Sequence, residues 1–249
     1  MAFVQVVFET GPTGSAALFS QPVNMILARQ PSEVDAALDR MDAALGEGYW
    51  IAGYLTYELG YAIEPKLLSL MPKDRRQPLL SLGVYECPKE KLTFEDSEVW
   101  FGTFTPEWSA ADYRHAFEQV HGYISAGDIY QANLTFPMHT EICGTSEAIF
   151  ATLKQAKREN YRTLIVQENG PDIISCSPEL FFNLDRDGML ETRPMKGTQP
   201  RSSDPIRDKE LKSFLADDPK NRAENLMIVD LLRNDLSRIC RQGSVKVPQ

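Results

Sequence analysis

Lys196 is the residue of this chain whose type and neighbours best suit the formation of a covalent bond with a ligand. It lies between a run typical of a hairpin strand and a Gly197-Thr198 turn, where a glycine allows a ligand to approach the backbone closely. A lysine amine is a nucleophile only in its neutral form, and burial favours that form. An ordinary loop lysine in water is the alternative, and this pattern alone leaves both open.

Glu179 is the second candidate, because it follows Ser177-Pro178 at the head of an apolar strand-like run. A partly buried carboxyl group keeps its proton more readily than one in water, so Glu179 can serve as a general acid. A carboxylate that caps a turn or forms an ion pair is the commoner arrangement. The sequence around Glu179 does not decide between them.

Glu224 is the third candidate, and it lies in a helix that is apolar on nearly all sides because of residues 226–229 and 231–232. Such a pattern predicts a buried helix. A buried glutamate requires a cation or a metal ion as a partner. An ion pair with Arg222 or Arg233 is therefore the alternative to a metal site.

The elements that must position these residues favour an α+β fold over a doubly wound sheet, which would alternate strands and helices regularly. Ser109 and Asp112 form a capping pair at the start of a helix that Gly127 ends, and Ser146 is expected to cap a second helix that runs to about Lys157. Strand-like runs occupy residues 129–138, 163–167, 172–175, 180–184 and 190–194, with a hairpin turn at 185–188. Two helices, at 205–216 and 219–238, follow, and Pro219 suits a first helical position.

The first hundred residues predict a mixed region with short strands at 3–8, 24–28, 50–55 and 82–85. A helix over 31–45 has Ser32 as its expected cap and Gly46 as its stop. We therefore predict two domains, an N-terminal region of residues 1–105 and a second domain of residues 106–249.

Composition and charge exclude several classes of protein. The formal net charge is −9 with no block of Lys and Arg, which argues against nucleic-acid binding. No apolar run approaches the roughly 20 residues that span a membrane, and the N-terminus lacks the pattern of a signal peptide. Four scattered cysteines without a CxxC pair are typical of reduced thiols, so we predict a cytoplasmic protein.

Four segments in order resemble the chorismate-binding enzymes, a family that includes anthranilate, aminodeoxychorismate and isochorismate or salicylate synthases. The segments are GDIYQANL at 127–134, SPELFF at 177–182, TRPMKGTQPR at 192–201 and RAENLMIVDLLRNDL at 222–236. The resemblance is densest over residues 108–247, and residues 48–65 are similar to the aminodeoxychorismate branch. It implies a fold of large antiparallel sheets packed together and flanked by helices.

Lys196 distinguishes the branches of this family, because anthranilate synthases carry alanine at the matching position and aminodeoxychorismate synthases carry lysine. The resemblance implies amination of chorismate to 4-amino-4-deoxychorismate, a step toward 4-aminobenzoate and folate. Lys196 would add to C2 of chorismate with loss of the C4 hydroxyl, and Glu179 would act as general acid and base. Gly197 and Thr198 match positions that contact chorismate, and Glu224 matches a ligand of Mg²⁺.

The same resemblance implies partners. Ammonia would come from a glutamine amidotransferase subunit, since the sequence has no Gly-x-Cys-x-Gly nucleophile elbow, and an aminodeoxychorismate lyase would take the product. The family's domain continues well beyond the segment matching residues 243–247. We therefore expect a fold incomplete at its C-terminus and a chain that is inactive alone.

Two other interpretations remain. An anthranilate or isochorismate synthase of the same family is disfavoured by Lys196. A non-catalytic binding or scaffold fragment would explain the missing second half of the domain. Such a scaffold has no need for Glu179, Lys196 and Glu224 together.

Overall fold

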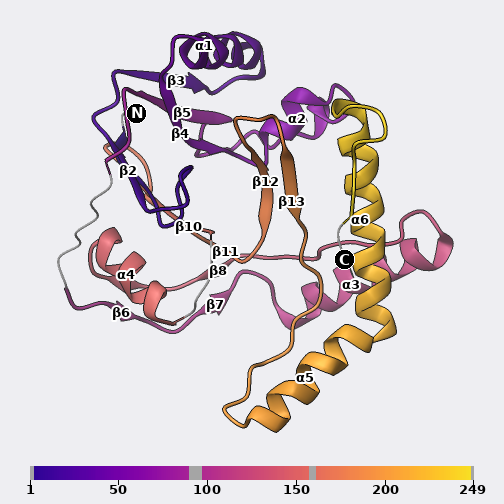
Figure 1. Ribbon diagram of the computed structural model, residues 1–249. Helices are drawn as coiled ribbons and strands as arrows, with labels where there is room; N and C mark the ends of the chain where they lie inside the picture. Colours follow the sequence, from indigo (N-terminus) through magenta and orange to yellow (C-terminus); the bar gives the residue numbers. More distant parts are fainter. Residues whose placement is uncertain (1–2, 90–96, 157–160, 248–249) are drawn as a thin grey trace. The chain divides into compact units, whose positions relative to one another are not determined.

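The computed structural model describes residues 3–89, 97–156 and 161–247 (Figure 1). The chain forms two compact units: the first contains Met1–Phe101 and Ile142–Pro178, and the second contains Gly102–Glu141 and Glu179–Gln249. The chain thus leaves the first unit, returns to it and leaves it again. The division into domains at residues 105 and 106 stays a prediction, and the compact units do not follow it, because residues 142–178 pack with the N-terminal strands.

The first unit contains two antiparallel sheets. The four-stranded sheet has the order β11-β10-β1-β2, and the three-stranded sheet has the order β3-β5-β4. The strands are β1 (Phe3–Phe8), β2 (Ala17–Ser20), β3 (Asn24–Ala28), β4 (Trp50–Leu55), β5 (Leu80–Tyr85), β10 (Tyr161–Gln167) and β11 (Ile173–Ser177). The strands predicted at 3–8, 24–28 and 50–55 are confirmed, and the strand predicted at 82–85 begins two residues earlier. The unit also contains a separate antiparallel pair of two-residue strands, β6 (Trp100–Phe101) and β9 (Ile142–Cys143).

The apolar core of the first unit consists of three clusters of buried side chains. They lie between a helix and the three-stranded sheet, between the two sheets, and between the four-stranded sheet and a second helix (Figure 1). Alternate residues of β5 point to opposite faces: Leu82 packs with the helix α1 (Val34–Gly46), and Tyr85 packs between the two sheets. The Tyr85 and Phe19 rings meet there, with centroids 5.2 Å apart. Phe150 of α4 (Ser146–Ala156) covers the outer face of the four-stranded sheet. Antiparallel sheets packed together and flanked by helices are confirmed as the fold class.

Two predicted helix caps in the first unit are wrong. The helix near residue 31 begins as a 3₁₀ turn, η1 (Pro31–Glu33), so Ser32 already lies inside it. The Glu33 carboxylate accepts the backbone amides of Gln30 and Arg29 instead, and these bonds lower the pKa of Glu33. The cap predicted at Ser146 is also wrong, because the hydroxyl of Thr145 accepts the backbone amide of Ala148 at the start of α4.

The remaining helical segments of the first unit are short, α2 (Leu59–Ile63) and η2 (Leu68–Leu70). Ser146 is the first residue of α4, and its hydroxyl donates to Asp172 instead of capping the helix. The predicted end of this helix at Lys157 lies outside the described residues.

The described part of the second unit contains three helices, a hairpin and a short strand pair. Its elements are β7 (Thr105–Pro106), α3 (Ala110–Ala126), β8 (Met138–His139), β12 (Leu180–Leu184), β13 (Leu190–Arg193), α5 (Pro205–Asp217) and α6 (Pro219–Ile239). The capping box of Ser109 and Asp112 is confirmed, and Gly127 ends α3 with a φ of 81°. The strand predicted at 129–138 is wrong, because the backbone is irregular until the two-residue strand β8.

The predicted hairpin turn and the start of the last helix are confirmed. The Asp185 carboxylate accepts the amides of Asp187 and Met189, and Gly188 has a φ of 79°. Pro219 is the first residue of α6, and the Asp218 carboxylate accepts the amide of Asn221 at 2.9 Å.

The prediction that the last helix is buried is wrong. No residue of α6 is buried, and Leu226 is 61% exposed. Throughout the part of the second unit that the structure describes, no residue is buried. The apolar side chains of α6 are therefore not covered by the residues that the structure describes. Among the described residues, no helix has the length and apolar character needed to cross a membrane.

Candidate active site

All five predicted site residues lie in the second unit. Glu179 directly precedes β12, Lys196, Gly197 and Thr198 follow β13, and Glu224 lies in the second turn of α6. These residues therefore belong to one compact unit, within which their segments contact one another.

The hairpin brings Glu179 to the backbone beside Lys196. Strands β12 and β13 pair with Leu180 opposite Arg193, so the residue before β12 and those after β13 meet at one end of the hairpin. There the Glu179 Oε1 accepts the backbone amide of Met195 at 3.2 Å. Both Glu179 and Lys196 are half-buried. The SPE and RPMKGT segments, which are separate in sequence, therefore form one local structure.

Gly197 holds this segment against the helix pair. Its φ of 74° is in the left-handed region, and a Cβ at this position would lie 2.5 Å from Asn221 Oδ1 and 3.1 Å from Leu215 Cδ1. The backbone conformation thus favours glycine, and a Cβ would also require the Asn221 side chain to shift. The contact places Lys196 and Thr198, its neighbours in sequence, beside the first turn of α6.

Glu224 lies one helical turn after Asn221, on the same side of α6. Its side chain is 30% exposed, and its Oε1 is 3.8 Å from Lys220 Nζ. The ion pair is therefore with Lys220 rather than with Arg222 or Arg233, the alternatives that the sequence suggested, and Arg233 binds Asp230 instead. A pair with an exposed lysine at this distance contributes little stability.

Glu224 is a single carboxylate and belongs to no closed metal site among the described residues. Across residues 3–89, 97–156 and 161–247, no group of three or more His, Cys, Asp or Glu side chains is placed to hold an ion. Magnesium needs few protein ligands, because it commonly retains waters and binds one or two carboxylates together with oxygens of the substrate. Glu224 meets that requirement as a single carboxylate.

Residues 196–202, here called the lysine segment, are held at their C-terminal end by a salt bridge that the sequence interpretation missed. Arg201 donates from Nε and Nη2 to the two carboxylate oxygens of Asp208, at 2.7 and 2.8 Å. Asp208 also accepts the amide of Ser202 at 3.0 Å, which ties the segment to the first turn of α5. The Arg201 hydrogen bonds, with that amide, lower the pKa of Asp208 to about 2. An aspartate in the first turn of a predicted helix is the signal that could have revealed this contact.

Asn221 was also missed, although it lies directly against Gly197. The helix prediction placed it in a first turn but contained nothing about its tertiary neighbour. Asn221 is therefore a contact that only the fold reveals.

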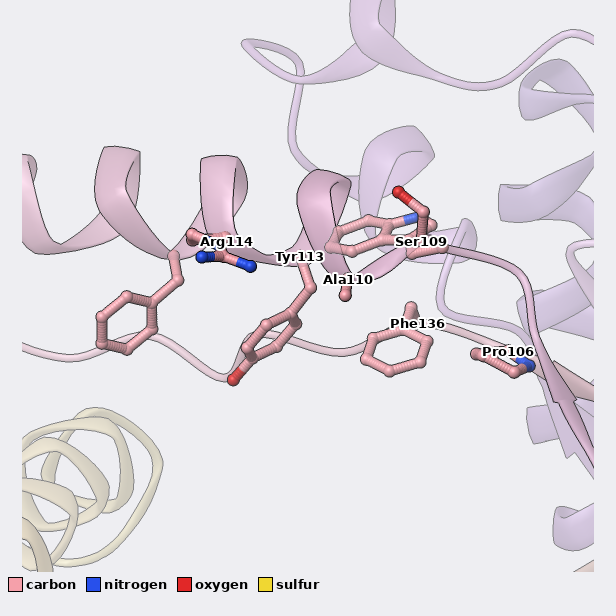
Figure 2. Close-up of a pocket in the computed structure, with 8 residues that line it drawn as sticks. Pro106, Ser109, Ala110, Tyr113, Arg114 and Phe136 are labelled. Atoms are coloured by element: carbon pink, nitrogen blue, oxygen red, sulfur yellow. The ribbon is translucent and has the colours of Figure 1, made fainter.

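An apolar groove lies elsewhere in the second unit, along α3 (Figure 2). It has a volume of about 520 Å³, and its lining residues are Pro106, Trp108, Ser109, Ala110, Tyr113, Arg114, Phe117 and Phe136. None of the predicted site residues lines it. The groove is thus a separate feature from the polar segment around Lys196.

Comparison with known proteins decides the family, because the pattern that describes chorismate binding enzymes matches residues 5–249. The chain belongs to the chorismate-binding enzyme family. A crystal structure from Bacillus anthracis, described as a 2,3-dihydroxybenzoate-specific isochorismate synthase, shares the fold of this chorismate-binding chain with a TM-score of 0.69. The two sequences are 24% identical, and the alignment covers 99% of this chain and 63% of the other.

Two curated relatives of this chorismate-binding chain are called aminodeoxychorismate synthase component 1. The protein from Klebsiella aerogenes is 33% identical over 244 residues, which is 95% of this chain and 49% of the relative. The protein from Escherichia coli is 42% identical over 151 residues, which is 59% of this chain and 33% of the relative. The chain thus spans half or less of the length of these relatives.

Proposed function

We propose that the segment around Lys196 is part of a site that aminates chorismate to 4-amino-4-deoxychorismate. The observation that carries the proposal is the bond from the Met195 amide to the Glu179 carboxylate, which holds a candidate general acid beside a candidate nucleophile. The relatives called aminodeoxychorismate synthase support it, as does lysine at the position that distinguishes this branch of the family.

The proposed reaction has two substitutions. The neutral Lys196 amine forms a bond to C2 of chorismate, the ring double bonds shift, and the C4–O bond breaks as Glu179 donates a proton to the departing hydroxyl, which leaves as water. Ammonia then forms a bond to C4, the double bonds shift back, and the bond from C2 to Lys196 breaks. Glu179, now a carboxylate, accepts a proton from the incoming ammonia, so the enzyme is restored.

The neighbouring residues would bind and orient the substrate. The backbone of Gly197 and Thr198 borders the segment that carries the nucleophile, and the absence of a side chain at 197 lets the segment lie close to α6. Glu224 would hold Mg²⁺, which when bound would offset the charge of a substrate carboxylate. The position of Glu224 one turn after Asn221 supports this role, because Asn221 contacts Gly197.

The proposal includes two partner proteins. A glutamine amidotransferase subunit would supply ammonia, and an aminodeoxychorismate lyase would convert the product toward 4-aminobenzoate.

The test uses a chimera in which residues 1–249 replace the matching part of the Klebsiella aerogenes relative. The chimera is assayed with chorismate, excess ammonium and Mg²⁺, so that no amidotransferase is needed, and 4-amino-4-deoxychorismate is measured by mass spectrometry. We expect Lys196→Ala to lower the amination rate by more than about 100-fold, because it removes the nucleophile.

Lys209→Ala is the matched control, since Lys209 is an exposed lysine on α5 and should leave the rate unchanged. An unchanged rate and product in Lys196→Ala would show that this lysine is not the nucleophile. Fluorescent anthranilate as the main product of the unmodified chimera would overturn the proposed function itself.

A further inference from the structure

Lys220 and Glu224 form an ion pair that the stability of α6 does not explain. The Lys220 Nζ lies 3.8 Å from the Glu224 Oε1, and the two residues are one helical turn apart. Lys220 is the second residue of α6, where the positive end of the helix dipole disfavours a cation. A lysine that precedes its glutamate by four positions is also the weaker of the two orientations of such a pair. Helix stability therefore gives little reason for a lysine at this position.

The two side chains of this pair differ in how freely they can move. The Glu224 side chain is 30% exposed, whereas that of Lys220 is 82% exposed. A lysine ammonium on its flexible stem can turn into water at little cost, and a carboxylate that is mostly covered has less freedom. The pair can thus be opened by movement of Lys220 alone. Glu224 would then stay in place and be available to another cation.

The pair lies beside the lysine segment. Asn221 follows Lys220 directly and lies against Gly197, and Glu224 follows Asn221 by one turn on the same side of α6. The carboxylate that pairs with Lys220 is therefore the one to which the proposed function assigns Mg²⁺.

We propose that Lys220 competes with the divalent cation for the Glu224 carboxylate and so lowers the affinity of the site for the metal. This inference rests on the proposed function, in which Glu224 binds Mg²⁺. Lys220 pairs with Glu224 while no metal is bound, so that a mostly covered carboxylate is not left without a cation. Lys220 leaves the carboxylate when the metal binds, because two cations at one carboxylate repel each other. The affinity for the metal thus includes the cost of displacing Lys220.

The size of the effect follows from Coulomb's law. At a separation of about 5 Å in water, a unit charge and a divalent ion repel each other by an amount that corresponds to roughly a 15-fold change in affinity. Salt at a concentration of about 0.1 M reduces this change to about 5-fold. The dielectric constant of water applies here, because the Lys220 side chain is exposed.

The test uses the chimera described above, at a fixed pH and without chorismate, with Mn²⁺ as the probe. Mn²⁺ also prefers oxygen ligands, and electron paramagnetic resonance measures its free concentration, so a titration gives its dissociation constant. Competition by Mg²⁺ then gives the dissociation constant of Mg²⁺. We expect Lys220→Met to bind both metals about 5-fold more tightly than the unmodified chimera in about 0.1 M salt. Lys220→Arg keeps the positive charge and should not show this gain.

Lys209→Met is the matched control, because it removes the same charge from an exposed lysine on α5. It should change the dissociation constant by less than about 2-fold. The gain in Lys220→Met should also shrink in about 1 M salt, where charges interact over only about 3 Å. A purely structural effect of the substitution would neither tighten metal binding nor depend on salt in this way.

Three results would overturn the inference. If Lys220→Met binds Mn²⁺ no more tightly than Lys209→Met, Lys220 does not compete for the carboxylate, and the proposed function stands. An equal gain in Lys220→Arg would show that the charge is not the cause. If Glu224→Gln binds Mn²⁺ as tightly as the unmodified chimera, Glu224 is not a metal ligand, and the magnesium part of the proposed function is wrong as well. A gain in Lys220→Met that disappears when Glu224→Gln is added would establish the competition.

Discussion

The helices α1 and α3 show how differently the two units of this chain are stabilised. Helix α3 has both ends satisfied locally, with a capping box at Ser109 and a left-handed Gly127, yet none of its residues is buried. Helix α1 has no side-chain bond at its own N-cap, yet Val34 and Ala37 are buried against the three-stranded sheet. Local signals therefore determine where a helix begins and ends, but packing determines whether its apolar face is covered.

Removal of one aromatic ring from each unit should show the largest difference in stability between the two units. Phe19 is 1% exposed between the two sheets, and Phe181 is 80% exposed on β12. Phe19→Ala should lower the free energy of unfolding by about 3–5 kcal/mol, because it removes buried area and leaves a cavity. Phe181→Ala should change it by less than about 0.5 kcal/mol.

Urea denaturation followed by tryptophan fluorescence and circular dichroism measures both variants. Equal losses of stability would show that Phe181 is buried in solution and that the contrast between the units is wrong. Two separate transitions would sharpen the contrast, and the Phe19→Ala loss should then appear in only one of them.

A second comparison uses two glycines of the second unit with similar backbone angles. Gly197 and Gly127 have φ values of 74° and 81°, but only at Gly197 would a Cβ meet other atoms. Gly127→Ala should cost about 1 kcal/mol for the left-handed backbone, and Gly197→Ala should cost up to about 1 kcal/mol more, because the Asn221 side chain must shift. The free energy of unfolding, or the hydrogen exchange of α6 where unfolding is not two-state, measures the difference.

Asn221→Ala should reduce the extra cost of Gly197→Ala, because it removes the atoms that a Cβ would meet. If the two glycine variants cost the same, the contact between the lysine segment and α6 is absent in solution. Glu224 would then not be held near Lys196 by this contact.

The smallest expected effect is the pH dependence of the salt bridge between Arg201 and Asp208. The pKa of Asp208 is about 2 in the folded chain and 3.8 for an ordinary aspartate. Because the folded pKa is the lower one, the stabilisation is present above pH 3.8 and is lost as the pH falls toward 2. Solvent weakens this exposed bridge, so the effect on stability should be modest.

Carboxyl resonances followed by NMR should place the Asp208 midpoint near pH 2, and Arg201→Gln should return it toward 3.8. Glu33 is a control in the first unit, since its pKa is lowered by backbone amides and should not respond to Arg201→Gln. A midpoint for Asp208 near 3.8 in the unmodified chain would show that the bridge does not hold the end of the lysine segment.

The predictions that failed have a common physical cause. Residues 129–138 alternate enough to indicate a strand, but a strand needs a neighbour for its backbone groups, and β8 keeps only two residues in a pair. The last helix has the apolar surface of a buried helix, but burial depends on what packs against it. Ser32 is a suitable cap by residue type, but the helical turn already begins at Pro31, so Ser32 lies inside its first turn.

The local features of this chain follow from short stretches of its sequence. The hairpin turn at Asp185, the capping box at Ser109 and the start of α6 at Pro219 depend on residues within four positions of each other, so their signals are complete in a short segment. The order of the four family segments was likewise readable without a structure.

The meeting of distant segments, in contrast, depends on the complete fold. Strand β10 pairs with β1 although their sequences are far apart, which is why residues 142–178 belong to the first unit. In the second unit, Glu179 reaches the Met195 amide and Asn221 reaches Gly197 through the folding of a hairpin and a helix pair. Such contacts depend on how apolar faces and backbone hydrogen bonds are satisfied across the whole fold, and no short segment contains that information.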